Sequence, residues 1–161
     1  MQSQAFAIRT AVQEDATAVI DCLGAAFAEY RAAYTLEGFT DTVLTSETFA
    51  ARLKKMQVFV AVADPNEIVG TIACEGVGGG EGHLRGLGVV PDWRGRGIAR
   101  ELLLCAEAWL SKEGCRRITL DTTAPLLPAA RFYLRNGDCA RLLQYDGWPN
   151  ADFTDRASSP Q

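Results

Sequence analysis

The sequence predicts one domain of the α/β class, in which a mixed β-sheet is flanked by helices. Its 161 residues, 48% hydrophobic and 22% charged, fit a single globular domain. Short apolar segments of strand length alternate with longer segments of helical periodicity. The expected order is strand, two helices, three strands, helix, strand, helix and one or two closing strands. This order is typical of a mixed sheet that carries helices.

The N-terminal third is predicted to form a strand and two helices. Residues 6–9 alternate between apolar and polar, and Thr10 with Gln13 has the spacing of a capping box before the first helix. Ser46 or Thr45 can cap the second helix. The buried faces are expected to hold Ala16, Val19, Ile20, Leu23 and Phe27 in the first helix and Phe49, Leu53 and Met56 in the second.

The segment between these two helices, residues 30–45, shows no clear period. It carries three aromatic residues in a polar setting, Tyr30, Tyr34 and Phe39. These side chains could line a binding pocket or pack beneath a loop, and packing is the simpler interpretation.

Three strands are predicted in the middle of the chain. Residues 58–63 are apolar at every position, which indicates a strand covered on both faces. A turn at residues 64–67 leads to a second strand over residues 68–74. Glycines between residues 76 and 82 predict a flexible connection to a third strand over residues 83–90. Gly86 and Gly88 inside that strand indicate a bulge or the close approach of another backbone or of a ligand.

The C-terminal half is predicted to begin with a helix from about Gly95 to Lys112, ended by Gly114. Its inward face is expected to hold Ile98, Leu102, Ala106, Trp109 and Leu110. A strand is expected at residues 118–122, a short helix at about 129–135 and a further strand near 141–144. We expect the polar tail, residues 155–161, to be mobile.

Composition excludes several classes of protein. No apolar run reaches the roughly 18 residues of a membrane span, and charged residues interrupt the N-terminus where a signal peptide would be apolar, so we expect a cytoplasmic protein. A net charge of −4 argues against nucleic-acid binding. Five cysteines without a C-x-x-C pair, and one histidine, argue against disulfides and against a metal site. We interpret all five cysteines as small buried apolar groups.

The segment His83 to Ala99 carries the clearest chemical signal. A strand ends, a short turn follows, and glycines open a helix, so main-chain N–H groups without helical partners converge on one place. These amides and the positive end of the helix dipole favour phosphate oxygens, and Arg94, Arg96 and Arg100 add positive charge. The P-loop pattern is absent, and Arg100 stands where the dinucleotide fingerprint needs its third glycine.

The same residues resemble the GNAT superfamily of N-acyltransferases. Leu87-Gly88-Val89-Val90-Pro91 is similar to the strand end of that family, and Arg94-Gly95-Arg96-Gly97-Ile98-Ala99 is similar to its R/Q-x-x-G-x-G/A turn. Phe132-Tyr133 followed by Asn136-Gly137 resembles its late helix. The resemblance extends over about residues 6–137 of a single domain, and implies a twisted, mostly antiparallel sheet with a central splayed pair of parallel strands and about four helices.

The resemblance implies acetyl-CoA as co-substrate and no metal. The pantetheine arm would enter a V-shaped opening between the parallel strands, one ending near Val90 and the other starting near Ile118, and pair with backbone from Leu87 through Gly88 to Val89. The diphosphate would sit on the amides of Arg94, Gly95, Arg96, Gly97, Ile98 and Ala99. The Val89 N–H would stabilise charge on the thioester oxygen, Tyr133 would be the general acid and His83 the base, with Glu81 and Glu75 as alternatives.

The activity that the resemblance implies is direct transfer of acetyl to a primary amine in a ternary complex. The alternative is a non-catalytic acyl-CoA sensor or interaction module on the same fold. Because Tyr133 and His83 are both present, we favour the enzyme. The negative chain weakly favours a cationic acceptor, and we favour a small-molecule amine slightly over a protein amine. Dimerisation through the C-terminal strands is common in such folds.

Overall fold

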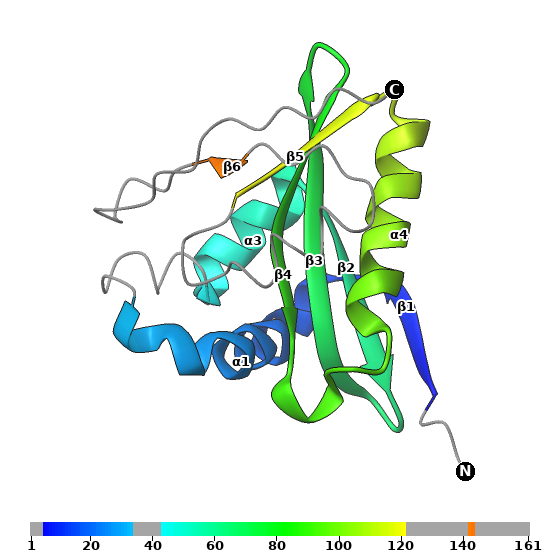
Figure 1. Cartoon of the computed structure of the whole chain (residues 1–161). Coiled ribbons are helices and arrows are strands. Elements are labelled where there is room, and N and C mark those ends of the chain that lie inside the picture. Colours follow the sequence, from blue (N-terminus) through cyan, green and yellow to red (C-terminus); the bar gives the residue numbers. More distant parts are fainter. Residues whose placement is uncertain (1–4, 34–42, 122–141, 144–161) are drawn as a thin grey trace.

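The computed structural model describes residues 5–33, 43–121 and 142–143 and contains one six-stranded sheet with the strand order β1-β2-β3-β4-β5-β6 (Figure 1). The strands are β1 (Phe6–Thr10), β2 (Gln57–Ala63), β3 (Glu67–Gly78), β4 (Glu81–Val89), β5 (Arg117–Asp121) and β6 (Leu142–Leu143). The α-helices of the described residues are α1 (Ala16–Phe27), α3 (Ser46–Lys55) and α4 (Ile98–Lys112). Short 3₁₀ segments are η1 (Gln13–Asp15), η2 (Ala28–Ala33) and η3 (Pro91–Trp93).

The predicted fold class is confirmed. The pairs β1–β2, β2–β3 and β3–β4 are antiparallel, whereas β4–β5 and β5–β6 are parallel. The described part holds three α-helices, compared with the expected four, and the helix expected over residues 129–135 lies outside it.

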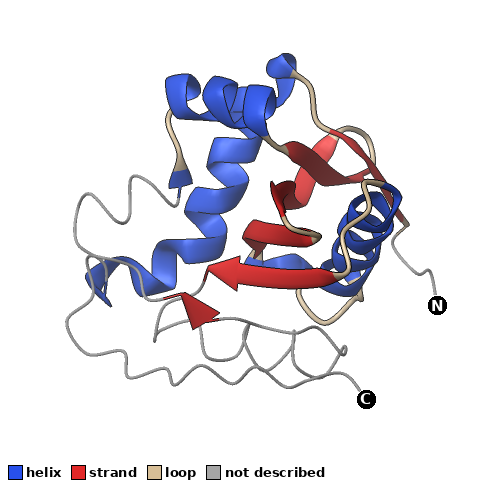
Figure 2. Cartoon of the chain, turned by 90° about the horizontal axis from the view of Figure 1, so that it is seen from above, coloured by secondary structure: helices blue, strands red, loops and turns tan. Residues whose placement is uncertain are grey.

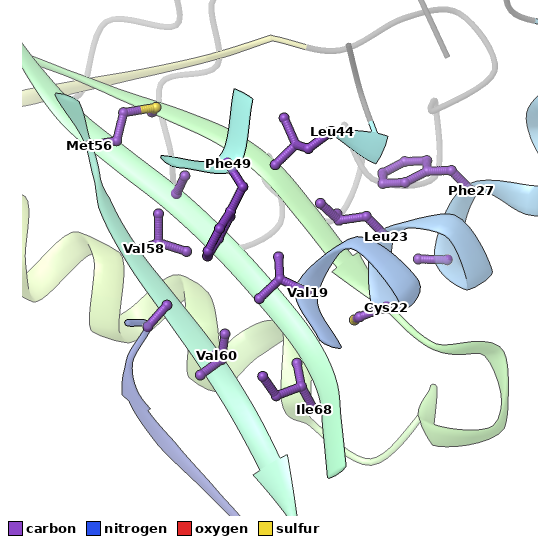
Figure 3. Packing of buried hydrophobic residues seen from close by; sticks show 13 residues of the cluster. Val19, Cys22, Leu23, Phe27, Leu44, Phe49, Met56, Val58, Val60 and Ile68 are labelled. Carbon is purple, nitrogen blue, oxygen red and sulfur yellow. The ribbon is translucent and has the colours of Figure 1, made fainter. Parts of the chain in front are cut away.

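The sheet separates two hydrophobic cores. On one face, α4 packs on β3 and β4 through Ile98, Leu102, Leu103, Ala106 and Leu110. On the other face, α1 and α3 pack on β2 and β3, and Phe49 lies among Val19, Val58 and Val60 (Figure 3). Seen from above, α4 lies on the opposite side of the strands from the other two helices (Figure 2). Each face of β4 therefore belongs to a different core.

The start of α1 differs from the prediction. Thr10 is the last residue of β1 and caps no helix, so the expected capping box of Thr10 and Gln13 is wrong. The Asp15 carboxylate instead accepts the Val12 N–H at 2.8 Å and two N–H donors of Arg9 at 2.7 and 2.8 Å. The sequence left Ser46 and Thr45 as alternative caps of α3. The structure shows that Thr45 is the cap, because its side chain accepts the Thr48 N–H.

The glycines between residues 76 and 82 do not form the expected flexible connection. Gly76 and Gly78 belong to β3 and Gly82 belongs to β4, so the hairpin extends to a tight turn at Gly79 and Gly80. Gly82 is a close packing point, because a Cβ there would lie 2.8 Å from Leu110 of α4. Small residues here serve the contact between helix and sheet.

The cysteines are less uniformly buried than predicted. Cys22 and Cys74 are buried, and burial raises the pKa of each thiol to about 12. Cys105 and Cys115 are half-buried, and Cys139 lies outside the described residues. Searching the described helices for a segment long and apolar enough to cross a membrane gives none.

Candidate functional site

The two central parallel strands separate partway along their length. β4 pairs with β5 from Glu81↔Arg117 to Leu84↔Leu120, and the pairing stops there although β4 continues to Val89. The five residues from Arg85 to Val89 therefore have β3 on one side and, among the described residues, no strand partner on the other. The family resemblance implied an opening between β4 and β5, and the strand register places its start after Leu84.

A β-bulge marks the start of this opening. Thr71 pairs with Gly88 and Ala73 pairs with Arg85, so two residues of β4, Gly86 and Leu87, face the single residue of β3 between them. Gly86 has a φ of +66°, a backbone conformation that favours glycine. Of the explanations left open for these glycines, the bulge is therefore confirmed at Gly86.

Gly88 has a packing explanation of its own. A Cβ at this position would lie 3.1 Å from the Cβ of Ala26 and 3.2 Å from Cδ2 of Leu23, so α1 rests directly on the strand. The side chains of Leu87 and Val89 pack on the opposite core. What β4 offers to a ligand between residues 87 and 89 is therefore its main chain.

The Val89 amide points into the opening. The N–H of Val90 donates to the Val69 carbonyl of β3 at 2.9 Å. Because successive residues of an antiparallel strand alternate the side on which their main-chain groups point, the N–H and the carbonyl of Val89 point away from β3. Its N–H is therefore directed to the side on which a ligand between the strands would lie.

A turn rich in main-chain donors connects β4 to α4. Gly95 and Gly97 have φ values of +80° and +84°, and Gly97 caps α4 without a side-chain hydrogen bond. Within the described residues, the N–H groups of Gly95, Gly97, Ile98, Ala99 and Arg100 have no acceptor; the first helical hydrogen bond runs from the Glu101 N–H to the Gly97 carbonyl. The helix thus starts three residues later than predicted and exposes a cluster of donors at its positive end.

The guanidinium of Arg94 points away from these donors. It donates to three oxygens: the Val89 carbonyl at 3.3 Å, the Ala26 carbonyl in the last turn of α1 at 2.9 Å, and the Glu29 carboxylate at 2.6 Å. The Arg94 N–H donates to Pro91 at 3.2 Å. Arg94 therefore joins the end of β4 to α1, and the set of exposed amides begins at Gly95.

The other two arginines of the turn differ from each other. Arg96 stacks over the ring of Trp93, with 4.5 Å between its Cζ and the ring centre, and donates to the Asp92 carbonyl. Arg100 is exposed in the first turn of α4, and no acceptor contacts its side chain within the described ranges. Arg94, Arg96 and Arg100 were all expected to add positive charge near the amides. Within the described residues, Arg94 and Arg96 donate to protein oxygens and Arg100 does not.

The candidate bases lie at the other end of β4. His83 pairs across the strands with Glu75, and strand alternation places Glu81, His83 and Arg85 on the face covered by α1 and α3. Glu81 forms an ion pair with Arg117 at 3.4 Å, and Glu75 forms one with Lys55 at 3.9 Å. Among the described residues, no group of three His, Cys, Asp or Glu side chains is arranged as metal ligands.

Several predicted residues cannot be placed. Tyr133, the expected general acid, and Tyr34 and Phe39 lie outside the described residues, as does the side chain of Tyr30. One residue near the opening was missed by the sequence analysis: Arg52 of α3 is only 9% exposed, and its Nη1 lies 2.7 Å from the position of a Cβ on Gly86. Arg52 follows Phe49 by three residues and therefore lies on the same buried face of α3, which is the signal that could have found it.

A family model described as "Acetyltransferase (GNAT) family" matches residues 23–137. An aminoglycoside N(6')-acetyltransferase type 1 of Stenotrophomonas maltophilia is 37% identical over 73 residues, which are 40% of this chain and 48% of that protein. The chain thus spans about half the length of the curated relatives it matches.

Solved structures of other proteins share the fold, and two of them contain a bound cofactor. The PaiA N-acetyltransferase of Thermoplasma acidophilum in complex with coenzyme A has a TM-score of 0.72 and 21% identity, over 83% of this chain and 89% of that one. A GNAT family acetyltransferase of Brucella melitensis in complex with acetyl-CoA has a TM-score of 0.63 and 25% identity, over 83% and 82% of the two chains.

Proposed function

Because the chain belongs to the acetyltransferase (GNAT) family, we propose that it transfers an acetyl group from acetyl-CoA to a primary amine, with direct attack of the amine in a ternary complex. The observation that carries the proposal is the combination of the opening after Leu84 with the amide cluster that begins at Gly95. The opening accepts a narrow chain and the amide cluster accepts an anion. Five residues, 90–94, join the two.

The cofactor arm is proposed to lie along β4 as an added strand. The Val89 N–H points into the opening, and the neighbouring side chains are turned into the α4 core, so main-chain hydrogen bonds are available. The diphosphate is assigned to the amides from Gly95 to Arg100. Such a site binds phosphate through dipoles that are fixed before the ligand arrives, and Arg100 adds one exposed charge.

In the proposed reaction, the lone pair of the neutral amine attacks the carbonyl carbon of the thioester, and the bond from carbon to sulfur breaks. A main-chain N–H of β4 stabilises the charge on the carbonyl oxygen, as preorganised donors do. The departing thiolate takes a proton from Tyr133, and the amine loses one to a base. The role of Tyr133 rests on its motif, because the residue lies outside the described part.

The length of β4 limits how Val89 and His83 can cooperate. They are six residues apart on β4, which sets an upper limit of roughly 20 Å at about 3.3 Å per residue, and the bulge at Gly86 shortens the separation. A single carbonyl cannot touch both. If Val89 contacts the thioester oxygen, His83 acts only through intervening water. His83→Gln, compared with Glu75→Gln and Glu81→Gln, separates the candidates, because loss of the base removes the low-pH limb, in which kcat rises as the base loses its proton.

A small-molecule amine is the proposed acceptor. The aminoglycoside acetyltransferase among the relatives supports this class over a protein amine. The acceptor is assigned to the face of β4 that α1 and α3 cover, where the candidate bases also lie.

Thermal unfolding with and without acetyl-CoA tests the binding part of the proposal. At about 100 times its dissociation constant, a ligand that binds only the folded chain adds about 2.7 kcal/mol. For a domain of this length we expect a rise in Tm of roughly 5–10 °C. No rise at millimolar acetyl-CoA would refute the proposed function.

Release of free thiol, followed over a panel of amines, tests the transfer. Turnover with any amine separates the enzyme from a sensor of acyl-CoA. Tyr133→Phe is expected to lower kcat while leaving the acetyl-CoA shift in Tm in place, because the substitution keeps the aromatic ring and removes only the acidic proton. An unchanged kcat would remove Tyr133 as the acid.

A further inference from the structure

The last turn of α1 lies directly on the end of β4. A Cβ on Gly88 would be 3.1 Å from Cβ of Ala26, 3.2 Å from Cδ2 of Leu23 and 3.4 Å from Cε2 of Phe27. Leu23 and Phe27 belong to the core that α1 and α3 form with the sheet (Figure 3). Gly88 directly precedes Val89, whose N–H points into the opening. This turn of the helix therefore borders the place where the thioester carbonyl is proposed to lie.

The apolar packing of this segment ends with α1. The helix stops at Phe27 and the chain continues as η2, whose described side chains, those of residues 28, 29, 31 and 32, are exposed. Among the described residues, η2 is joined to the turn after β4 by an ion pair, in which Glu29 binds Arg94 at 2.6 Å. The position of η2 beside the end of β4 therefore depends on a polar contact.

Arg94 uses all three nitrogen atoms of its guanidinium in this region. Nη1 donates to the Glu29 carboxylate, Nη2 to the Ala26 carbonyl at 2.9 Å and Nε to the Val89 carbonyl at 3.3 Å. The three acceptors belong to η2, to α1 and to β4. Because a guanidinium is planar and rigid, hydrogen bonds to three oxygens fix the position of these elements relative to one another.

The same residue directly precedes the amides to which the diphosphate is assigned. The Arg94 N–H donates to the Pro91 carbonyl, and the N–H groups without an acceptor among the described residues begin at Gly95. The side chain of Arg94 is thus directed to α1 and η2, away from the proposed diphosphate site. Its contribution to the reaction is therefore expected on the acceptor side, with little effect on cofactor binding.

We infer that Arg94 is a positioning residue for the acceptor, because it holds the last turn of α1 and η2 beside Val89, where they align the attacking amine with the thioester carbonyl. The acceptor was assigned to the face of β4 that α1 covers, so an amine that reaches Val89 from this face lies next to the end of α1. A displacement of about 1 Å at such a place can lower the rate about 100-fold. The inference rests on the proposed acetyl transfer, since it concerns the acceptor side of that site.

Kinetics of Arg94→Gln test the inference, with thiol release as the readout and the most active amine of the panel as acceptor. We expect kcat/KM for the amine to fall about 10- to 100-fold. The dissociation constant of coenzyme A, measured by titration calorimetry, should change less than about 3-fold, because the amides that hold the diphosphate remain. Arg94→Lys keeps the charge without the planar fork and should recover only part of the loss. Glu29→Ala removes one of the three bonds at an exposed position and should lower kcat/KM about 2- to 5-fold.

Asp15→Asn is the matched control for lost stability. Asp15 lies at the opposite end of α1, where its carboxylate accepts hydrogen bonds from Arg9 and Val12. This variant is expected to be destabilised about as much as Arg94→Gln and to keep the wild-type kcat/KM for the amine. Hydrogen exchange compares the two without any substrate. Arg94→Gln should speed exchange of the amides in the last turn of α1 about 10-fold, whereas Asp15→Asn should leave these amides as in the wild type.

A folded Arg94→Gln protein with the wild-type kcat/KM for the amine would overturn the inference, and so would an equal loss in Asp15→Asn. If Arg94→Gln does not fold, wild-type kinetics in both Glu29→Ala and Arg94→Lys would overturn it. A weaker affinity for coenzyme A that accounts for the whole loss would assign Arg94 to the cofactor instead. Absence of both an acetyl-CoA shift in Tm and thiol release with any amine in the wild-type protein would refute the proposed function, and this inference with it.

Discussion

Nη1 of Arg94 lies 2.6 Å from Oε1 of Glu29, although 65 positions separate the two residues in the sequence. The same guanidinium donates to the carbonyls of Ala26 and Val89. One side chain thereby joins the turn before α4 to the end of α1 and to the last residue of β4. A cation is favourable at this position, because the C-terminal end of a helix carries partial negative charge.

Replacement of Arg94 is expected to cost more stability than replacement of its acidic partner. Arg94→Gln should lower the free energy of unfolding by about 1–2 kcal/mol, since the two carbonyls lose a charged donor. Glu29→Gln should cost less than about 1 kcal/mol, because both side chains of the pair are 41% and 50% exposed and water screens their charges. Urea unfolding at pH 7 measures both values. Equal losses in the two variants would mean that the ion pair, and not the carbonyl contacts, carries the stabilisation.

The three arginines of the turn should contribute unequally to coenzyme A binding. Arg100→Gln is expected to weaken binding about 3- to 10-fold at low salt, and the effect should shrink at 0.5 M salt because an exposed charge is screened. Arg94→Gln and Arg96→Gln should change the dissociation constant less than about 3-fold, since both side chains are directed to protein atoms. Titration calorimetry at two salt concentrations measures these constants. A dominant effect of Arg94 would show that its side chain turns to the ligand.

Addition of one methyl group at Gly88 should destabilise the fold. The new Cβ of Gly88→Ala would press on Ala26 and Leu23 of α1, at 3.1 and 3.2 Å, and crowding of this kind costs about 1–3 kcal/mol. Gly76→Ala, in β3, is the control, because its Cβ would meet only Cys115 Sγ at an ordinary 3.6 Å. We expect no loss of stability in the control. Urea unfolding compares the two, and similar values for both would show that α1 can shift away from β4.

The hydrogen bonds that the Asp15 carboxylate accepts should make the free energy of unfolding depend on pH. The side-chain hydrogen bonds from Arg9 lower the pKa of the Asp15 carboxyl below its ordinary value near 4, and the Val12 N–H acts in the same direction. The unfolded chain therefore binds this proton more readily than the folded chain does. The stabilisation is complete above pH 4 to 5 and is lost as the pH falls through the folded-state pKa.

Asp15→Asn is thus expected to cost about 1–2 kcal/mol at pH 7, and its difference from wild type should shrink as the pH falls from about 5 toward 3. Asp21→Asn, which removes an exposed carboxylate from α1, is the control. Urea unfolding at four pH values measures both series. A difference for Asp15→Asn that is independent of pH would mean that its charge does not contribute.

The local elements follow from side-chain patterns that lie close together in the sequence. The apolar residues 58–63, the helical spacing of Val19, Leu23 and Phe27, and the glycines at 95 and 97 each act within a few neighbouring residues. They predicted a strand, a helix and a turn with free donors, and the structure contains all three. The ends of the elements were predicted less accurately than the elements themselves. Positive φ values at Gly95 and Gly97 move the start of α4 to Ile98, and the spacing of apolar residues carries no information about φ.

The sequence by itself therefore determined the order of the elements over the described residues, the mixed sheet and the glycine turn with free main-chain donors, because each depends on short-range periodicity and on glycine conformation. Only the tertiary structure decided that Gly88 is required by α1, that Arg94 points to Glu29, and that Arg52 lies over Gly86. These contacts join residues between 34 and 65 positions apart. Their direction is set by how the helices pack on the two faces of the sheet, and that packing is a property of the whole fold.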